Sequence, residues 1–227
     1  MLQTAILLLA AGNSSRLGRA KQLVPFGRNT LLKHAAQTAL GAELGPVTVV
    51  LGADEDRCRE TLGVLPLTII SNPKWEDGMG GSIAAGMEPI DESAYRAVIV
   101  MLCDQPAITT EVLRSLAMLQ RLSDKPIVAS EYDGTLGAPA IFGASEYPAL
   151  RRLEGHQGAK SLFNDPSKLT TLPCPEGAVD IDTEKDLETL EERIRRATPA
   201  YIAGRKWTAQ SGPSSRGEIR EPSLRPV

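Results

Sequence analysis

Two continuous apolar runs stand out along the chain, at Thr4–Ala10 and Arg96–Cys103. Strands that are buried on both faces of a parallel sheet lose the usual alternation of apolar and polar residues. Both runs therefore predict central, buried strands. Shorter apolar runs at Pro46–Leu51 and Leu67–Ile70 predict two more strands, and the Gly- and Pro-containing stretch Pro126–Phe142 predicts further strands at an edge of the sheet.

Helical periodicity separates these strands. Apolar residues recur with the spacing of one helix face, which predicts helices at about Leu31–Leu40, Asp54–Leu62, Ser82–Met87, Thr110–Leu122 and Thr183–Arg196. A short apolar strand, Val179–Ile181, is expected just before the last of them. Strands and helices that alternate through short connections predict a parallel sheet with right-handed crossovers. The fold class is therefore α/β.

Charge divides the 227 residues into two parts. Residues 204–227 have a net charge of +3, are rich in Gly, Ser and Pro, and show no apolar period, which predicts a disordered tail. A basic arm that docks a partner is the alternative. Residues 1–203 then form one domain with a net charge of −6. Such a charge argues against a nucleic-acid partner, because the phosphate backbone demands a basic surface.

The cysteines and the first apolar run bear on the compartment. Cys58, Cys103 and Cys174 are far apart and have no Cys/His ligand spacing, which argues against a zinc or iron–sulfur site. Scattered free thiols suit a reducing cytoplasm, so a cytoplasmic location is expected. The first apolar run is too short to cross a bilayer and no Lys or Arg precedes it, so no membrane anchor is expected.

The loop after the first strand has the composition of a phosphate cradle. Ala10, Ala11 and Gly12 allow backbone N–H groups to approach an anion closely, and Arg16 and Lys21 supply positive charge. Ligands bind open α/β sheets at the carboxyl ends of strands, which is where this loop lies. It matches neither the Walker A loop nor the G-x-G-x-x-G fingerprint. A flexible loop with incidental charges is the alternative.

The same loop, Leu8-Leu9-Ala10-Ala11-Gly12-x-x-x-Arg16-x-Gly18-x-x-Lys21, resembles that of the nucleotidyltransferases that attach a nucleotide to molybdopterin. Counterparts of the group's other motifs follow in order, at Gly78–Ser82, Cys103–Pro106, Gly137–Phe142 and Asp180–Thr183. The resemblance implies a Rossmann-like, three-layer α/β/α fold with a mostly parallel sheet, of the nucleotide-diphospho-sugar transferase type. Guanylyltransferases of this group tend to have Gly where this chain has Ala11, so the nearest resemblance is to the cytidylyltransferases.

Roles for individual residues follow from the resemblance. Asp104 and Asp182, with Asp180 as the alternative to Asp182, would hold Mg²⁺, and Arg16 and Lys21 would hold the leaving pyrophosphate. Both aspartates also suit a turn or a helix cap, as does Ser82. The expected nucleotide contacts are Leu9, Ala10, Ala11, Gly12, Arg16, Lys21, Gly78, Gly80, Ser82 and Asp104.

The acceptor side departs from the family pattern. Gly155–Lys160 resembles a Gly-Asp-x-Gly-Ala-Arg segment, but His156 replaces Asp and Lys160 replaces Arg. Lys160 keeps the positive charge and loses the bidentate fork of arginine. Gln105, His156 and Lys160 are the candidate acceptor-binding residues. A solvated loop histidine is the alternative for His156.

The resemblance thus implies Mg²⁺-dependent transfer of CMP from CTP to a phosphorylated acceptor, foremost molybdopterin, with release of pyrophosphate. A molybdoenzyme is a further candidate partner. One alternative keeps the chemistry and takes a sugar or alcohol phosphate as the acceptor. The other is a non-catalytic chaperone that binds the cofactor, which two metal-binding carboxylates disfavour.

Overall fold

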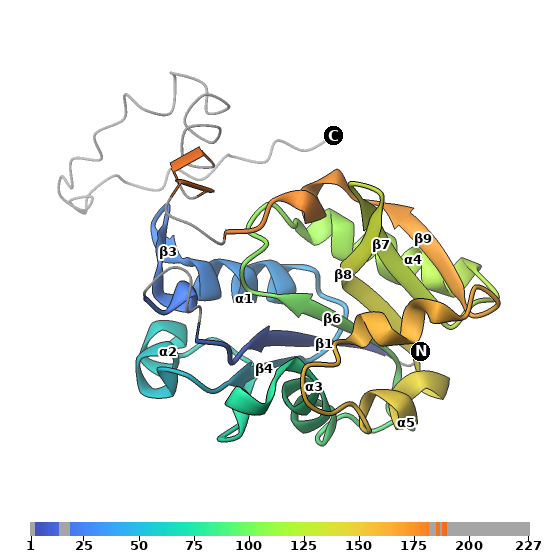
Figure 1. The fold of residues 1–227 in the computed structure, drawn as a ribbon, viewed down its shortest axis with the longest axis horizontal. Coiled ribbons are helices and arrows are strands. Elements are labelled where there is room, and N and C mark those ends of the chain that lie inside the picture. Colours follow the sequence, from blue (N-terminus) through green and yellow to red (C-terminus); the bar gives the residue numbers. More distant parts are fainter. Residues whose placement is uncertain (1–2, 14–18, 182–184, 187, 190–227) are drawn as a thin grey trace, which may run out of the picture. The chain divides into compact units, whose positions relative to one another are not determined.

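The central sheet is built around β1 (Gln3–Ala10) in a computed structural model that describes residues 3–13, 19–181, 185–186 and 188–189. Seven strands pair in the order β5-β4-β1-β6-β8-β7-β9 (Figure 1). The strands beside β1 run parallel to it, β4 (Val47–Leu51) and β6 (Tyr95–Leu102), and β5 (Thr68–Ser71) runs parallel to β4. These four strands therefore end at the same edge of the sheet.

The β1 residues explain why the sheet is covered on both faces. Ile6, Leu8 and Ala10 belong to one apolar core, whereas Leu7 and Leu9 belong to the core on the opposite face. Successive side chains of a strand point to opposite faces, so a continuous apolar run fills two cores at once. The two buried runs predicted from the sequence are confirmed as β1 and β6, each within one residue at either end.

Helices form the outer layers. The first core includes residues of α1 (Leu31–Gly41), α2 (Glu55–Leu62) and α4 (Thr110–Leu122), and the second those of α3 (Met79–Met87) and α5 (Tyr147–Leu150). Figure 1 shows α1 on one side of the central strands and α3 and α5 on the other. The expected α/β fold with three layers and a mostly parallel sheet is confirmed. Among the described residues, no helix is long and apolar enough to cross a membrane.

The far half of the sheet differs from the prediction. The stretch Pro126–Phe142 does form two strands, β7 (Ile127–Tyr132) and β8 (Thr135–Gly143), but both lie inside the sheet. Strand β8 is antiparallel to β6 and to β7, and the edge is formed by β9 (Leu169–Pro173). The pattern missed β9 because its residues are only partly buried, as expected of a strand with one neighbour.

The C-terminal part of the domain also needs a correction. Val179–Ile181, expected as a strand, pairs with no strand of the described part of the chain and follows a short 3-10 turn at Pro175–Ala178. Its apolar character has another cause, since Ile181 is fully buried in a small cluster with Val24, Phe26 and Leu31. The helix expected at Thr183–Arg196 is described at residues 185–186 and 188–189, which are helical. The tail expected at 204–227 lies outside the described residues.

Candidate active site

A cavity of about 690 Å³ lies at the carboxyl ends of β1 and β6. Its first wall, here called the strand-end wall, consists of Leu9–Asn13, Lys21, Gln22 and Leu102–Asp104. Its second wall, here called the helix wall, consists of Trp75, Glu76, Gly78, Met79, Ser82 and His156. In parallel α/β sheets this is the edge where ligands bind. Eight of the ten predicted nucleotide contacts line this cavity, at 9–12, 21, 78, 82 and 104.

An ion pair stands on the strand-end wall. The Nζ of Lys21 lies 3.0 Å from Oδ2 of Asp104, and the side chains are 12% and 24% exposed. Asp104 directly follows β6, and the Cys103 N–H donates to the Leu9 carbonyl at 3.3 Å, which ties the ends of β6 and β1 together. The sheet thus brings together a cation and a carboxylate that are 83 residues apart in the chain.

The second oxygen of Asp104 has a different environment. Oδ1 is buried and has no hydrogen-bond partner among the described residues. A buried carboxylate oxygen without a donor is costly unless a ligand or cation completes it. The neighbouring Cys103 does not offer a thiolate to a cation at this position. Burial, and after it the Asp104 charge, raise the pKa of its thiol, which stays protonated at neutral pH.

Gln22 holds the first loop and was missed by the sequence analysis. It is 2% exposed, and its Nε2 donates to the carbonyls of Ala10 at 2.8 Å and Gly12 at 2.6 Å. These two bonds fix the loop backbone at the point where the predicted phosphate cradle begins. A glutamine next to Lys21 has no distinctive spacing, so only the folded backbone reveals this function.

Close backbone contacts build the helix wall. Gly78 has a φ of +122°, and a Cβ there would lie 2.3 Å from the Gly155 carbonyl oxygen. The Gly80 N–H donates to that same oxygen at 2.9 Å. Gly80 itself does not line the cavity. It packs against the backbone of residues 154–157 and so helps to position His156. Glycine is required at both positions by this packing.

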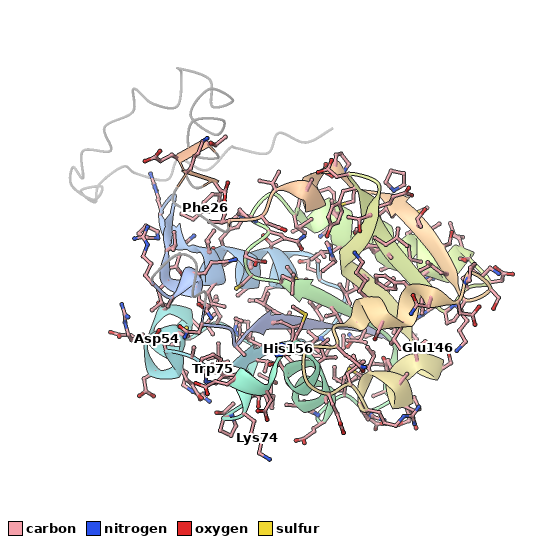
Figure 2. All side chains as sticks on the ribbon, viewed as in Figure 1. Phe26, Asp54, Lys74, Trp75, Glu146 and His156 are labelled. Atoms are coloured by element: carbon pink, nitrogen blue, oxygen red, sulfur yellow. The ribbon has the colours of Figure 1, made fainter. Side chains whose placement is uncertain are left out.

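The structure gives the surroundings of Ser82 and Trp75, two residues of the helix wall. Helix α3 begins at Met79, three residues earlier than expected, so Ser82 is the fourth helical residue and not the cap. Trp75 lines the cavity and packs on Gly52, where a Cβ would come within 2.6 Å of the tryptophan side chain. Figure 2 labels Trp75 and His156, which come from segments about 80 residues apart in the chain.

The three candidate acceptor residues separate in space. His156 is exposed and lines the cavity. Lys160 is not a lining residue, and its Nζ donates to Oγ1 of Thr135 at 2.7 Å. Gln105 is 3% exposed, and its Nε2 donates to the Gly177 carbonyl at 2.9 Å. The fold therefore places Gln105 inside the protein, where it holds the segment that leads to Asp180.

Two predicted residues, Arg16 and Asp182, lie outside the described residues. The chain does approach the site just before Asp182, since the Ile181 N–H donates to the Asp104 carbonyl oxygen at 3.0 Å. Asp180 contributes to the electrostatic environment that raises the pKa of Tyr132, after the larger effect of burial. Within the described chain no group of three or more His, Cys, Asp or Glu side chains could hold a metal ion.

Comparison with known proteins decides the family. Residues 6–170 match the model of the MobA-like NTP transferase domain. The chain belongs to this family. The MobA-like domain is a nucleotidyltransferase, as the sequence motifs had implied, and it spans all of the strand-end wall and the helix wall.

Relatives of this MobA-like domain have diverse names. The nicotine blue oxidoreductase of Paenarthrobacter nicotinovorans is 30% identical over 83% of this chain and 94% of that protein. The molybdenum cofactor guanylyltransferase of Rhodobacter capsulatus is 26% identical over 87% of this chain and all of that protein. The crystal structure of an Rv0371c homologue from Mycobacterium sp. strain JC1 superposes with a TM-score of 0.74 at 28% identity, covering 86% and 98% of the two chains.

Proposed function

We propose that this nucleotidyltransferase transfers CMP from CTP to a phosphorylated small molecule, foremost molybdopterin, and releases pyrophosphate. The observation that supports the proposal is the Lys21–Asp104 pair on a cavity of about 690 Å³ at the strand ends. The acceptor phosphate oxygen forms a bond to the α-phosphorus of CTP, and the bond from that phosphorus to the bridging oxygen of pyrophosphate breaks. No covalent enzyme intermediate is needed.

The chain's own groups would act through charge and position. Lys21, together with Arg16, neutralises the charge that develops on the leaving pyrophosphate, which lowers the barrier most when the groups are preorganised. Gln22 keeps the Ala10 and Gly12 carbonyls turned toward its amide, which fixes the loop that meets the phosphates. Alignment of two anions in a fixed geometry supplies the rest of the rate enhancement.

A divalent cation, with Mg²⁺ as the candidate, fits the residues present. Oδ1 of Asp104 is a buried oxygen that lacks a donor within the described chain, and hard oxygen ligands suit Mg²⁺. Mg²⁺ is commonly bound by one or two carboxylates together with substrate phosphates, so three protein ligands are not required. Asp104 would hold the cation with Asp182 or Asp180. When bound, it would neutralise charge on the phosphates.

Ala11 supports CTP over other nucleotides as the donor. Guanylyltransferases of this group tend to have a second Gly at this position, where this chain has Ala. The choice of acceptor has a competitor. Because Lys160 is bonded to Thr135 and lies off the cavity, the expected cation of the acceptor segment does not line the site. A sugar or alcohol phosphate is therefore the second candidate acceptor.

The test is pyrophosphate release from CTP, GTP, ATP and UTP, with Mg²⁺, against molybdopterin and a panel of sugar and alcohol phosphates. The proposal predicts release only when CTP and molybdopterin are both present. Release with a sugar phosphate instead would favour the second acceptor class. Nucleotide binding without release for any acceptor would favour the chaperone, and turnover of nicotine blue without nucleotide use would place the chain with the relative named as an oxidoreductase.

A further inference from the structure

The Lys21–Asp104 pair on the strand-end wall joins a fixed group to a movable one. The backbone of Asp104 is held in place, because its carbonyl oxygen accepts from the Ile181 N–H at 3.0 Å. Lys21 also starts from a fixed backbone, since it opens a 3-10 turn whose next side chain, Gln22, is bonded to the first loop. Its four-carbon stem, however, allows the ammonium to change position. The pair can therefore open through movement of the lysine side chain alone.

This pair weakens the affinity of Asp104 for a cation. The Lys21 ammonium lies 3.0 Å from Oδ2, on a wall where both side chains are mostly buried. An opposite charge this close changes the proton affinity of a carboxylate by roughly 10- to 10³-fold, and a metal ion meets the same competition and repulsion. Oδ1 has no partner within the described chain, but a divalent cation bound there would lie next to the ammonium. The nucleotide-free protein should therefore hold a cation only weakly.

The same pair weakens the attraction of Lys21 for phosphate. A triphosphate that arrives without a cation meets the Asp104 carboxylate on the cavity wall and an ammonium that is already in an ion pair. A triphosphate that arrives with a cation changes both interactions. Its oxygens attract the ammonium, and its cation compensates the carboxylate. The pair then opens once, and both charges gain new partners.

We propose that the Lys21–Asp104 pair couples the binding of the divalent cation to the binding of the nucleotide. Each member holds back the other's ligand until the two ligands arrive together. The inference rests on the proposed function, which supplies the nucleotide and the cation. Coupling of this kind is reciprocal, so removal of either member should strengthen binding of the ligand that the other member takes. The empty site is thereby protected from occupation by a stray metal ion.

Four variants separate this coupling from a general effect of charge. Lys21→Met removes the ammonium, whereas Lys21→Arg keeps the positive charge. Asp104→Asn removes the carboxylate charge at nearly constant shape. Lys168→Met is the matched control, because Nζ of Lys168 also lies 3.0 Å from a carboxylate oxygen, that of Glu146, whose side chain is 6% exposed. Neither member of this second pair lines the cavity.

The first measurement is binding of Mn²⁺ to the full-length chain without nucleotide, followed by water-proton relaxation at pH 8. Mn²⁺ is a suitable probe because it takes the same carboxylate ligands as Mg²⁺. We expect Lys21→Met to bind Mn²⁺ about 10- to 100-fold more tightly than the wild type. Lys21→Arg and Lys168→Met should match the wild type, and adding Asp104→Asn to Lys21→Met should abolish the gain.

The second measurement is calorimetric titration with CTP in EDTA, which keeps the nucleotide free of metal. Asp104→Asn should bind metal-free CTP about tenfold more tightly than the wild type, because it removes the charge that repels the phosphates and holds the Lys21 ammonium. Thermal unfolding of each variant checks that it is folded.

Equal Mn²⁺ affinity in the wild type and Lys21→Met would overturn the inference, as would an equal gain in Lys168→Met. If Lys21→Met fails to fold, the affinity of Asp104→Asn for metal-free CTP decides, and an unchanged value overturns the inference. A wild-type chain that binds no nucleoside triphosphate even with Mg²⁺ would instead overturn the proposed function. The two failures are therefore distinguishable.

Discussion

The strand-end wall and the helix wall are built in different ways. Parallel strands bring Lys21 and Asp104 together on the first, where charge and buried side-chain hydrogen bonds dominate. The second joins residues 75–82 to residues 154–157 through glycines that let two backbones touch. It contains the neutral hydroxyl of Ser82, the imidazole of His156 and one carboxylate, that of Glu76. One wall is organised for charge and the other for shape and hydrogen bonding.

This difference implies a division of labour. Charge near the phosphates stabilises the transition state more than the bound substrate, so the strand-end wall should govern turnover. Contacts to the base are made equally before and during the reaction, so the helix wall should govern which nucleotide binds and how tightly. Single substitutions on each wall test this division.

Lys21→Met should have the largest effect on catalysis. It removes the cation at the phosphates and leaves Asp104 without its partner, so we expect turnover to fall about 10²- to 10³-fold. Lys160→Met is the matched control, and because Lys160 bonds Thr135 outside the cavity we expect less than about a threefold change. Steady-state pyrophosphate release measures both. A large loss of turnover in Lys160→Met would show that Lys160 acts at the acceptor site after all. It would contradict the proposed difference between the two walls.

Gly80→Ala should damage the helix wall. A Cβ at Gly80 would lie 2.6 Å from the Glu154 carbonyl oxygen, so α3 and the His156 segment must separate. We expect a loss of about 1–3 kcal/mol in unfolding free energy and a raised KM for CTP at nearly normal kcat. Thermal unfolding and initial rates measure the two effects.

Gly81→Ala is the control for this substitution. It lies in the same helix, and its Cβ would meet no described atom within 4 Å. Alanine is the better helix former, so the stability of Gly81→Ala should be unchanged or higher by up to about 1 kcal/mol. Equal losses in the two variants would show that the close contact at Gly80 has no role in the wall.

Gln105→Ala tests whether Gln105 binds the acceptor or positions the chain. Loss of the bond to Gly177 should destabilise the protein by about 1–2 kcal/mol and lower kcat about tenfold, because the segment next to Asp104 loosens. The KM for the acceptor should stay the same. Initial rates at varied acceptor concentration measure this. A rise in the KM for the acceptor with no change in kcat or stability would show that Gln105 binds the acceptor.

Cys58 concerns stability at alkaline pH only and should leave turnover and nucleotide binding unchanged, since it lines neither wall. Burial raises the pKa of its thiol from 9.0 to about 11. The folded chain therefore keeps a proton that the unfolded chain loses, and stability falls as the pH rises from about 9 to 11, by at most about 1.4 kcal/mol per pH unit. Denaturant titrations of the wild type and Cys58→Ala should show a shallower pH dependence in the variant. Identical slopes would contradict the assignment.

Much of the fold could be predicted because its strands are buried on both faces. A run such as Ile6–Leu9 supplies side chains to both cores when it forms a strand covered on both faces, and helix α4 was predicted with both of its ends. Strand β9 was missed, and Val179–Ile181 was wrongly predicted as a strand, because local composition does not show which segment pairs at the edge of a sheet. Partner choice at an edge depends on the whole sheet.

The site divides in the same way. Lys21 and Asp104 could be predicted, because strand ends meet at one edge, Asp104 closely follows β6 and Lys21 lies in the connection that follows β1. Gln22 and Gln105 could not, since each bonds backbone atoms of a folded or remote segment. The sequence contains the amide groups but not the directions in which they point.

The most direct test of this division compares Asp104→Asn with Ser82→Ala in one assay of pyrophosphate release from CTP. We expect Asp104→Asn to lose about 10²- to 10³-fold in kcat. Ser82→Ala, which changes a residue of the helix wall, should keep a nearly normal kcat and raise the KM for CTP. Near-normal turnover in Asp104→Asn, or a loss of kcat in Ser82→Ala as large as that in Asp104→Asn, would show that the two walls do not divide the work in this way.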